Sequence, residues 1–201
     1  MIRAVVFDLG KVLVDFDYGI AARALAARSR VPVEEVRHVI DQSQLLVTYE
    51  TGKLATKLFY NQVCEATGFC GDIDEFSRLF GDIFTPIDDM IDLHAKLRAA
   101  GMATYVFSNT NELAVAHIGR TFPFFSNFDG YIYSFEEGAM KPSAAIYEAV
   151  ERRAGCSGNA ILYIDDRPEN IDTGRQRGWG VIHHQNAVDT RKAAAALGLP
   201  V

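Results

Sequence analysis

The feature that most constrains the fold is a short apolar run that ends on an aspartate, almost at the amino terminus. Val5, Val6 and Phe7 form the continuous apolar segment that a strand buried on both faces requires, and Asp8 follows directly. A carboxylate at the carboxyl end of a central parallel strand faces the crevice in which open α/β sheets bind ligands. Gly10 lets the backbone turn sharply or approach a ligand closely. Taken alone, Asp8 fits a helix N-cap or a turn equally well, so the rest of the chain has to decide.

Downstream of Pro86 the sequence alternates between amphipathic helical segments and short apolar segments. Alternation of this kind is typical of a parallel sheet with helices on both faces. We therefore predict an α/β fold with a Rossmann-like parallel sheet. Its later strands are expected at residues 103–107, 131–134, 161–164 and 180–183.

A long stretch without strand periodicity separates the first strand from this alternating part. From about Tyr18 to Phe84, apolar residues recur at helical spacing. We expect a small all-helical unit inserted after the first strand, at residues 17–84, while residues 1–16 and 85–201 form the sheet core. The helices of the insert are expected at residues 20–28, 33–41, 54–66 and 73–84.

Composition limits the classes of partner and the cellular location. The 201-residue chain has a net charge of −6, which opposes nucleic acid or an anionic membrane as the main partner. No apolar run approaches the ~20 residues of a membrane span, and the amino terminus lacks a signal-peptide pattern. We therefore expect a cytoplasmic protein with reduced cysteines (Cys64, Cys70 and Cys156). A small phosphorylated substrate stays compatible with the acidic chain, because one lysine and one cation can reverse the local field.

Polar side chains follow three of the expected strands. If the strands are parallel, these side chains reach one edge of the sheet, and a lysine just before a later helix joins them. Clustered carboxylates need a cation, and hard oxygen ligands suit magnesium. A hydroxyl, an amide and a lysine suit a phosphoryl group, and one carboxylate can act as a nucleophile. The set comprises Asp8, Ser108, Asn109, Lys141, Asp165 and Asp166.

These residues lie in four segments that resemble the four motifs of the haloacid dehalogenase superfamily, in the right order. The segments are VVFDLGKVL, FSNT, MKP and YIDDRPEN, and they span residues 5 to 170. The helical insert is similar to the cap that covers the active site in the superfamily's small-molecule enzymes. Within the superfamily, the chain resembles bacterial sugar-phosphate phosphatases, notably glucose-1-phosphate phosphatases, and less closely the phosphatase domain of soluble epoxide hydrolases.

The resemblance implies a role for each matched residue. Asp8 would be the nucleophile that forms an aspartyl-phosphate, and Lys141 would neutralise charge on the phosphate and on Asp8. Ser108 and Asn109 would hold the transferring phosphoryl oxygens. The Mg²⁺ ligands would be Asp8, the backbone carbonyl of Gly10 and Asp166, with Asp165 supporting directly or through water.

Gly10 is the one departure from the family pattern. Most phosphatases of this superfamily carry a second aspartate there, as general acid and base, and glycine cannot protonate a leaving group. General acid catalysis is typically worth ~10²–10⁴-fold in rate. The phosphatases that this chain most resembles share the glycine. Asp15 and Asp17 could supply the proton, although a surface or hinge position suits them better.

Three further segments each allow two structural interpretations. Residues 49–52 (YETG) are either a substrate-facing loop or a plain turn between helices. His183-His184 fits a strand end better than a metal site, and the aromatic run between Phe122 and Tyr133 fits packing at the sheet edge better than a dimer contact. Both a monomer and a homodimer are compatible with the sequence.

The sequence therefore predicts a magnesium-dependent phosphomonoester hydrolase that acts on a small metabolite, such as the sugar phosphate glucose 1-phosphate. Three alternatives stay open. The first is a metal-independent 2-haloacid dehalogenase, which the Asp165-Asp166 pair opposes because carboxylates without a cation would repel an anionic substrate. The second is a sugar-phosphate mutase, and the third is a catalytically weak binding protein, which Gly10 keeps open.

Overall fold

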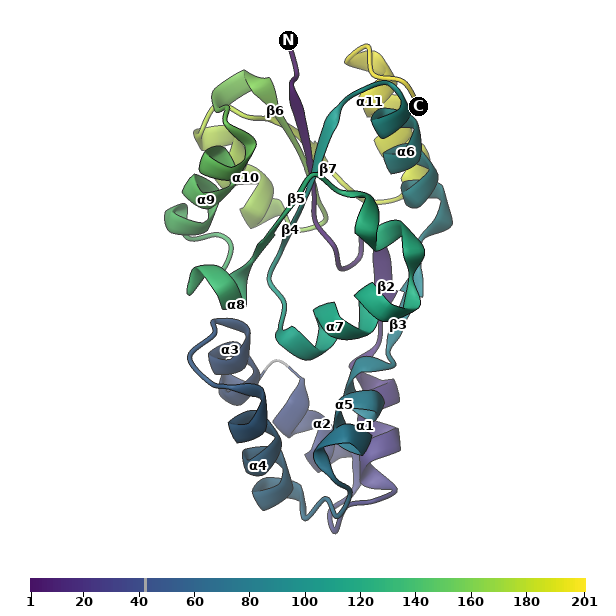
Figure 1. Cartoon of the computed structure of the whole chain (residues 1–201), viewed down its shortest axis with the longest axis vertical. Helices are drawn as coiled ribbons and strands as arrows, with labels where there is room; N and C mark the ends of the chain where they lie inside the picture. Colours follow the sequence, from purple (N-terminus) through teal and green to yellow (C-terminus); the bar gives the residue numbers. More distant parts are fainter. Residues whose placement is uncertain (42) are drawn as a thin grey trace.

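The computed structural model describes residues 1–41 and 43–201 and has two parts, an α/β core and a helical cap (Figure 1). The core holds a five-stranded sheet in the order β5-β4-β1-β6-β7, and each neighbouring pair of strands is parallel. The predicted α/β fold with a parallel sheet is therefore confirmed. The strands are β1 (Ala4–Phe7), β4 (Ala103–Ser108), β5 (Gly130–Tyr133), β6 (Ile161–Asp165) and β7 (Gly180–His183).

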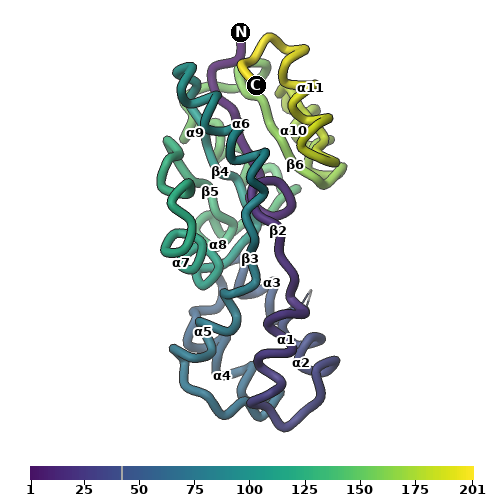
Figure 2. Tube along the Cα trace, turned by 90° about the vertical axis from the view of Figure 1, so that its right-hand side faces the viewer, coloured from purple at the N-terminus to yellow at the C-terminus, as the bar shows by residue number. Residues whose placement is uncertain are grey.

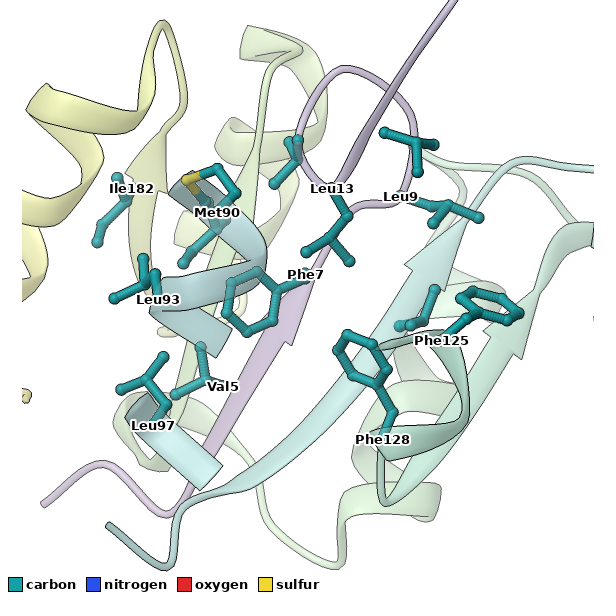
Figure 3. Close-up of a cluster of buried hydrophobic side chains, with 14 of the residues drawn as sticks. Val5, Phe7, Leu9, Leu13, Met90, Leu93, Leu97, Phe125, Phe128 and Ile182 are labelled. Atoms are coloured by element: carbon teal, nitrogen blue, oxygen red, sulfur yellow. The ribbon is translucent and has the colours of Figure 1, made fainter. Parts of the chain in front are cut away.

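Both faces of the sheet are covered, which explains why β1 is apolar throughout. Val5 and Phe7 pack toward α6 (Asp88–Ala99) in one hydrophobic cluster, and Val6 belongs to a second cluster with Tyr147 and Tyr163. Figure 3 shows Leu93 and Leu97 of α6 beside Phe7 and Val5. Alternate residues of a strand point to opposite faces, so a strand between two helical layers has no position for a polar residue until it ends.

The helices form two layers on the sheet (Figure 1). The first layer contains α6 and α11 (Ala187–Ala196), and the second contains α9 (Ala144–Ala154) and α10 (Pro168–Gln176). The remaining core helices are α7 (Glu112–Thr121), the short α8 (Ser134–Glu137) and the 3₁₀ turns η1 (Pro123–Asn127) and η2 (Gly158–Ala160). No helix in the described part of the chain is long and apolar enough to cross a membrane.

The predicted aromatic run packs within the core. Phe125 and Phe128 are buried, and Phe128 stacks on His94 with ring centroids 3.8 Å apart. Figure 3 shows both phenylalanines on the same side of the sheet as Phe7. These contacts support the packing interpretation.

The cap is a helical bundle with a hydrophobic core of its own. Phe59, Phe76 and Phe80 are each at most 1% exposed, and Phe59 stacks on Tyr49 with ring centroids 4.4 Å apart. The bundle comprises α1 (Tyr18–Ala26), α2 (Val33–Ile40), α3 (Gln44–Glu50), α4 (Thr56–Thr67) and α5 (Ile73–Gly81). The sequence analysis missed α3, because seven residues give too short a window for the helical period to stand out.

Two short antiparallel strands connect the parts: β2 (Val14–Phe16) pairs with β3 (Phe84–Pro86). Figure 2 shows them side by side between core and cap. The expectation of a helix through residue 84 was wrong, because α5 ends at Gly81 and Phe84 pairs with Phe16. The first predicted domain boundary falls at the end of β2 and the second inside β3.

Candidate active site

The strand ends bring the predicted polar residues to one edge of the sheet. Phe7 of β1 lies opposite Val106 of β4 and Ile164 of β6, so Asp8 and Asp165 follow at the same level and Ser108 comes one residue further along β4. Asp8 and Ser108 both line a cavity of about 560 Å³ beneath the cap, as do four more of the predicted site residues. These are Gly10, Asn109, Lys141 and Asp166.

Lys141 is the cation at the centre of this edge. Its Nζ lies 2.9 Å from Asp8 Oδ1 and donates hydrogen bonds to Asp165 Oδ2 (2.7 Å) and to the Phe107 carbonyl (3.0 Å). Its side chain is 2% exposed. Burial alone would lower the pKa of Lys141, but Asp8 and Asp165 raise it above its usual value, so the ammonium stays charged. A buried lysine bound to three acceptors supplies a fixed positive charge at this position.

Asp165 is held by donors from several directions. Its carboxylate accepts hydrogen bonds from Lys141, from the Arg167 backbone N–H (2.8 Å), from Asn170 Nδ2 (3.0 Å) and from the Tyr163 hydroxyl. Burial would raise the pKa of Asp165, but the lysine and these donors lower it to about 2. Asp165 is therefore ionised and orients Lys141. The sequence analysis assigned no role to Tyr163 or Asn170, although Asn170 lies five residues after Asp165 in the same motif.

The site contains more negative than positive charge. Asp8, Asp165 and Asp166 each offer one ligand atom, and these atoms lie within 4.8 Å of one another, in the one such cluster among the described residues. Burial raises the pKa of Asp8, Lys141 lowers it, and the two other carboxylates raise it further. Burial and Asp165 likewise raise the pKa of Asp166. Three carboxylates beside one ammonium fit a divalent cation, which would offset both the cost of burying these charges and the repulsion between them.

The Asn109 side chain binds the protein backbone. Its Oδ1 accepts from the Lys141 N–H at 2.8 Å, and its Nδ2 donates to the Lys141 carbonyl at 3.1 Å. These two bonds position the segment that carries Lys141. Ser108 is 3% exposed, and its Oγ donates a hydrogen bond to the Asn109 carbonyl at 3.3 Å. Phosphoryl binding by Ser108 and Asn109 stays a prediction.

Gly10 lies against an aromatic ring. A Cβ at this position would sit 2.7 Å from Cε1 of Phe16, so the Phe16 ring occupies the space that a longer side chain would need. The positive φ belongs to the next residue, Lys11, at 61°. Steric overlap with Phe16 therefore makes Gly10 the residue that fits here.

Neither aspartate proposed as a substitute acid lines the cavity. The Asp15 carboxylate binds Lys11 Nζ and accepts from the Phe16 N–H at 2.8 Å, and the Lys11 bond lowers its pKa. The Asp17 carboxylate caps α1 by accepting from the Gly19 N–H at 2.7 Å. Both carboxylates stabilise the connection to the cap, which supports the hinge interpretation.

The cap adds a carboxyl group to the cavity wall. Of the YETG segment, Glu50 lines the cavity, whereas Tyr49 is buried in the cap core and Gly52 turns the chain at φ 69° against the Phe135 carbonyl. Burial raises the pKa of Glu50 to about 7, against the effect of hydrogen bonding by Asn111 and Tyr18. The sequence analysis held the loop and turn interpretations equal, because no sequence signal showed which of the four residues faces inward.

The paired histidines lie at the end of β7, which agrees with the strand-end interpretation. Nε2 of His183 lies 2.9 Å from the Asp166 carbonyl, and Nδ1 of His184 lies 2.8 Å from Oγ1 of Thr190. Burial lowers the pKa of His184, which keeps this ring neutral. Neither histidine belongs to the carboxylate cluster described above.

With this geometry established, comparison with known proteins identifies the class. A family model described as haloacid dehalogenase-like hydrolase matches residues 2–178. The chain therefore belongs to the haloacid dehalogenase-like hydrolases, and the resemblance drawn from the four motifs is confirmed.

Two relatives of known activity are similar over nearly their whole length. A D-ribitol-5-phosphate phosphatase of Bacteroides thetaiotaomicron is 25% identical and is aligned over 96% of each chain. A sesquiterpene phosphatase of Aspergillus oryzae is 24% identical over 94% of this chain and 92% of its own. Both relatives are phosphatases.

Solved structures agree on the fold. A haloacid dehalogenase family enzyme of Bacteroides thetaiotaomicron, in complex with magnesium and inorganic phosphate, has a TM-score of 0.80 at 20% identity, over 90% of this chain and 93% of its own. A hydrolase of the same family from Porphyromonas gingivalis has a TM-score of 0.80 at 22% identity, over 97% and 98% of the two chains. An L-2-haloacid dehalogenase of Xanthobacter autotrophicus has a TM-score of 0.62 at 22% identity, over 96% of this chain and 83% of its own.

Proposed function

We propose that this protein is a magnesium-dependent phosphomonoesterase that acts on small phosphorylated metabolites, sugar phosphates such as glucose 1-phosphate included. The observation that supports it most directly is the cluster of three carboxylates next to the cavity, two of which contact the buried ammonium of Lys141. A phosphate monoester is a dianion, which this cluster would repel without a cation. Bound Mg²⁺, held by Asp8, Asp166 and the Gly10 carbonyl, would supply charge neutralisation and orient the phosphoryl oxygens.

The geometry of Asp8 suits nucleophilic attack. The Leu9 N–H and Lys141 Nζ both contact Oδ1, at 2.7 Å and 2.9 Å. Among the described residues, no donor contacts Oδ2, so Oδ2 is the oxygen available to attack phosphorus. Attack forms the Oδ2–P bond and breaks the bond between phosphorus and the ester oxygen, which leaves as an alkoxide and takes a proton from solvent water to give the alcohol. Water then attacks the aspartyl-phosphate, releases inorganic phosphate and restores Asp8.

Lys141 and Asp165 act on the charge balance of this step. Lys141 stays within hydrogen-bond distance of Asp8 and offsets the negative charge that gathers when phosphate and carboxylate approach. Asp165 holds the ammonium in this position through its 2.7 Å bond. Ser108 and Asn109, at the end of β4, would contact the phosphoryl oxygens.

A panel of phosphorylated metabolites tests the proposal, with phosphate release measured in Mg²⁺, in EDTA and after Mg²⁺ is restored. We expect release in Mg²⁺ and loss of at least about 10²-fold in EDTA. Chloride release from 2-chloropropionate that survives EDTA would instead establish the dehalogenase alternative. Transfer of phosphate to a second sugar would establish the mutase. Absence of both reactions from folded protein would favour a binding role.

The glycine at position 10 makes a second test possible. With no carboxylate there to protonate the leaving oxygen, kcat/KM should rise steeply as the leaving-group pKa falls, across esters of similar size. Aryl and anomeric sugar phosphates should therefore exceed primary alkyl phosphates. A flat series, with chemistry rate-limiting, would show that another group supplies the proton.

A further inference from the structure

Three polar side chains of the cap and core lie in the cavity wall away from the carboxylate cluster. Glu50 ends α3, Tyr18 begins α1, and Asn111 is the N-cap of α7 in the core. Asn111 Nδ2 lies 3.5 Å from Glu50 Oε1, and the Asn111 Oδ1 accepts from the Ala114 N–H at 3.0 Å. The Asn111 carboxamide is thus committed to the protein, which leaves Glu50 and Tyr18 to face a ligand.

The negative charge of the Glu50 carboxylate is poorly balanced by the protein. In residues 1–41 and 43–201, no basic nitrogen lies within 4 Å of its carboxyl group, and the 3.5 Å contact from Asn111 is long for a hydrogen bond. Its place at the carboxyl end of α3 adds the negative end of the helix dipole. Asp41, which lines the same cavity, differs because Arg37 Nε binds it at 3.2 Å. A carboxyl group can accept several hydrogen bonds, so beside Asn111 and Tyr18 the carboxyl group of Glu50 can still accept hydrogen bonds from a ligand.

We propose that Glu50, together with the Tyr18 hydroxyl, binds hydroxyl groups of the leaving alcohol and so selects polyol and sugar phosphates over hydrocarbon phosphates. This inference rests on the proposed phosphomonoesterase function and specifies its substrate class. A hydroxylated leaving group donates to Glu50 and exchanges hydrogen bonds with Tyr18. A hydrocarbon leaving group would instead bury both polar groups with only each other and Asn111 as partners, and sites built to hydrogen-bond a substrate hydroxyl reject such analogues.

The apolar part of the cavity wall is consistent with binding of a polyol or sugar phosphate. Leu46, Val47 and Phe84 also line the cavity, and they would contact the C–H faces of a sugar or polyol chain. A wall of these residues alone would favour a terpenoid. The presence of Glu50 and Tyr18 in the same wall favours the hydroxylated ligand.

Two probe esters of equal chain length test the inference: ribitol 5-phosphate and n-pentyl phosphate. The measured quantity is the ratio of their kcat/KM values, and comparing this ratio between variants cancels the intrinsic reactivity of each ester. For Glu50→Gln we expect the ratio to fall at least about tenfold, mainly through the KM of the polyol ester. For Tyr18→Phe we expect a fall of about threefold. Glu34→Gln, at an exposed glutamate of α2 in the same cap, is the matched control and should keep the wild-type ratio.

Glu50→Leu keeps the test decisive if other variants lose activity through misfolding. Replacing the carboxyl group by hydrocarbon should raise kcat/KM for n-pentyl phosphate above the wild-type value, a gain that misfolding cannot produce. If Glu50→Gln lowered kcat/KM equally for both esters, the inference would be overturned, and Glu50 would instead act by positioning the cap. An unchanged ratio with unchanged kcat/KM values would exclude contact between Glu50 and the leaving group. An inactive wild-type protein on every phosphomonoester would overturn the proposed function itself, whereas an active one with an unchanged ratio overturns the specificity inference alone.

Discussion

The core and the cap hold the polar side chains of the shared cavity in different ways. In the core, Lys141 contacts three acceptors and Asp165 accepts from four donor residues, so both side chains are fixed. In the cap, Glu50 has no charged partner among the described residues, and only Asn111, at a long 3.5 Å, and Tyr18 contribute hydrogen bonding to it. A group held by many partners keeps its position whichever ligand binds, whereas one with few partners is available to the ligand. This difference supports the proposal that the strand ends carry the chemistry and that the cap selects the substrate.

The largest expected effect is at the nucleophile in the core. Asp8→Asn should lower phosphate release by on the order of 10³-fold or more, because an amide of the same shape cannot form the aspartyl-phosphate. The fold should persist, since the Leu9 N–H can still donate to the amide oxygen and the repulsion with Asp165 and Asp166 is reduced. Activity and thermal unfolding are measured on the same sample. Substantial turnover by the pure, folded variant would remove Asp8 from the mechanism.

Truncation of a buried side chain in the cap should lower the stability of the protein more than it lowers its activity. Phe59→Ala removes a fully buried ring that stacks on Tyr49, and such truncations cost about 3–5 kcal/mol. The neighbouring Leu58 is 52% exposed, so Leu58→Ala should cost less than about 0.5 kcal/mol. Urea unfolding measures both variants. If Phe59→Ala left the midpoint unchanged, the cap would have no cooperative core of its own.

Variants of the two adjacent aspartates Asp165 and Asp166 should differ in the Mg²⁺ concentration that they require for activity. Asp166→Ala should raise the Mg²⁺ concentration for half-maximal activity by about 10²-fold, because a site with few protein ligands loses one of them. Asp165→Asn should leave the requirement closer to the wild-type value while it lowers kcat, since Asp165 orients Lys141. A magnesium titration of both variants shows which substitution raises the Mg²⁺ requirement more. An unchanged requirement in Asp166→Ala would contradict its assignment as a ligand.

The smallest expected effect is the pH dependence of stability that Glu50 produces. Its pKa is raised from 4.5 to about 7 in the folded protein, so its contribution to stability is fully present below pH 4.5 and is lost as pH rises through about 7. Solvent in the cavity screens the charge, and we expect a loss of about 1 kcal/mol. Urea unfolding at several pH values compares the wild type with Glu50→Gln. Parallel curves for the two proteins would show that Glu50 has its ordinary pKa.

Much of the core could be predicted from the sequence, for a local reason. The apolar residues of β1 and the helix–strand alternation after Pro86 are written in contiguous segments, and the polar residues that end parallel strands must meet at one edge. The antiparallel pair of β2 and β3 could not be predicted, because each strand has only three residues and the partners Phe16 and Phe84 lie far apart in the sequence. The contact between Phe16 and Gly10 could not be predicted either, because it depends on how β2 packs against the loop after β1.

The parallel-sheet core and the helical character of the insert could be predicted from periodicity, and Asp8, Asp165 and Asp166 could be grouped because they follow expected strands. Lys141 joined this group because it lies just before a later helix, and each of these signals is carried by a local segment. Only the tertiary structure placed Glu50 beside Asn111, which is 61 residues away, and turned it toward the cavity. The physical reason is that the direction of a cap side chain depends on how the bundle docks on the core, and no single segment of the chain encodes that docking.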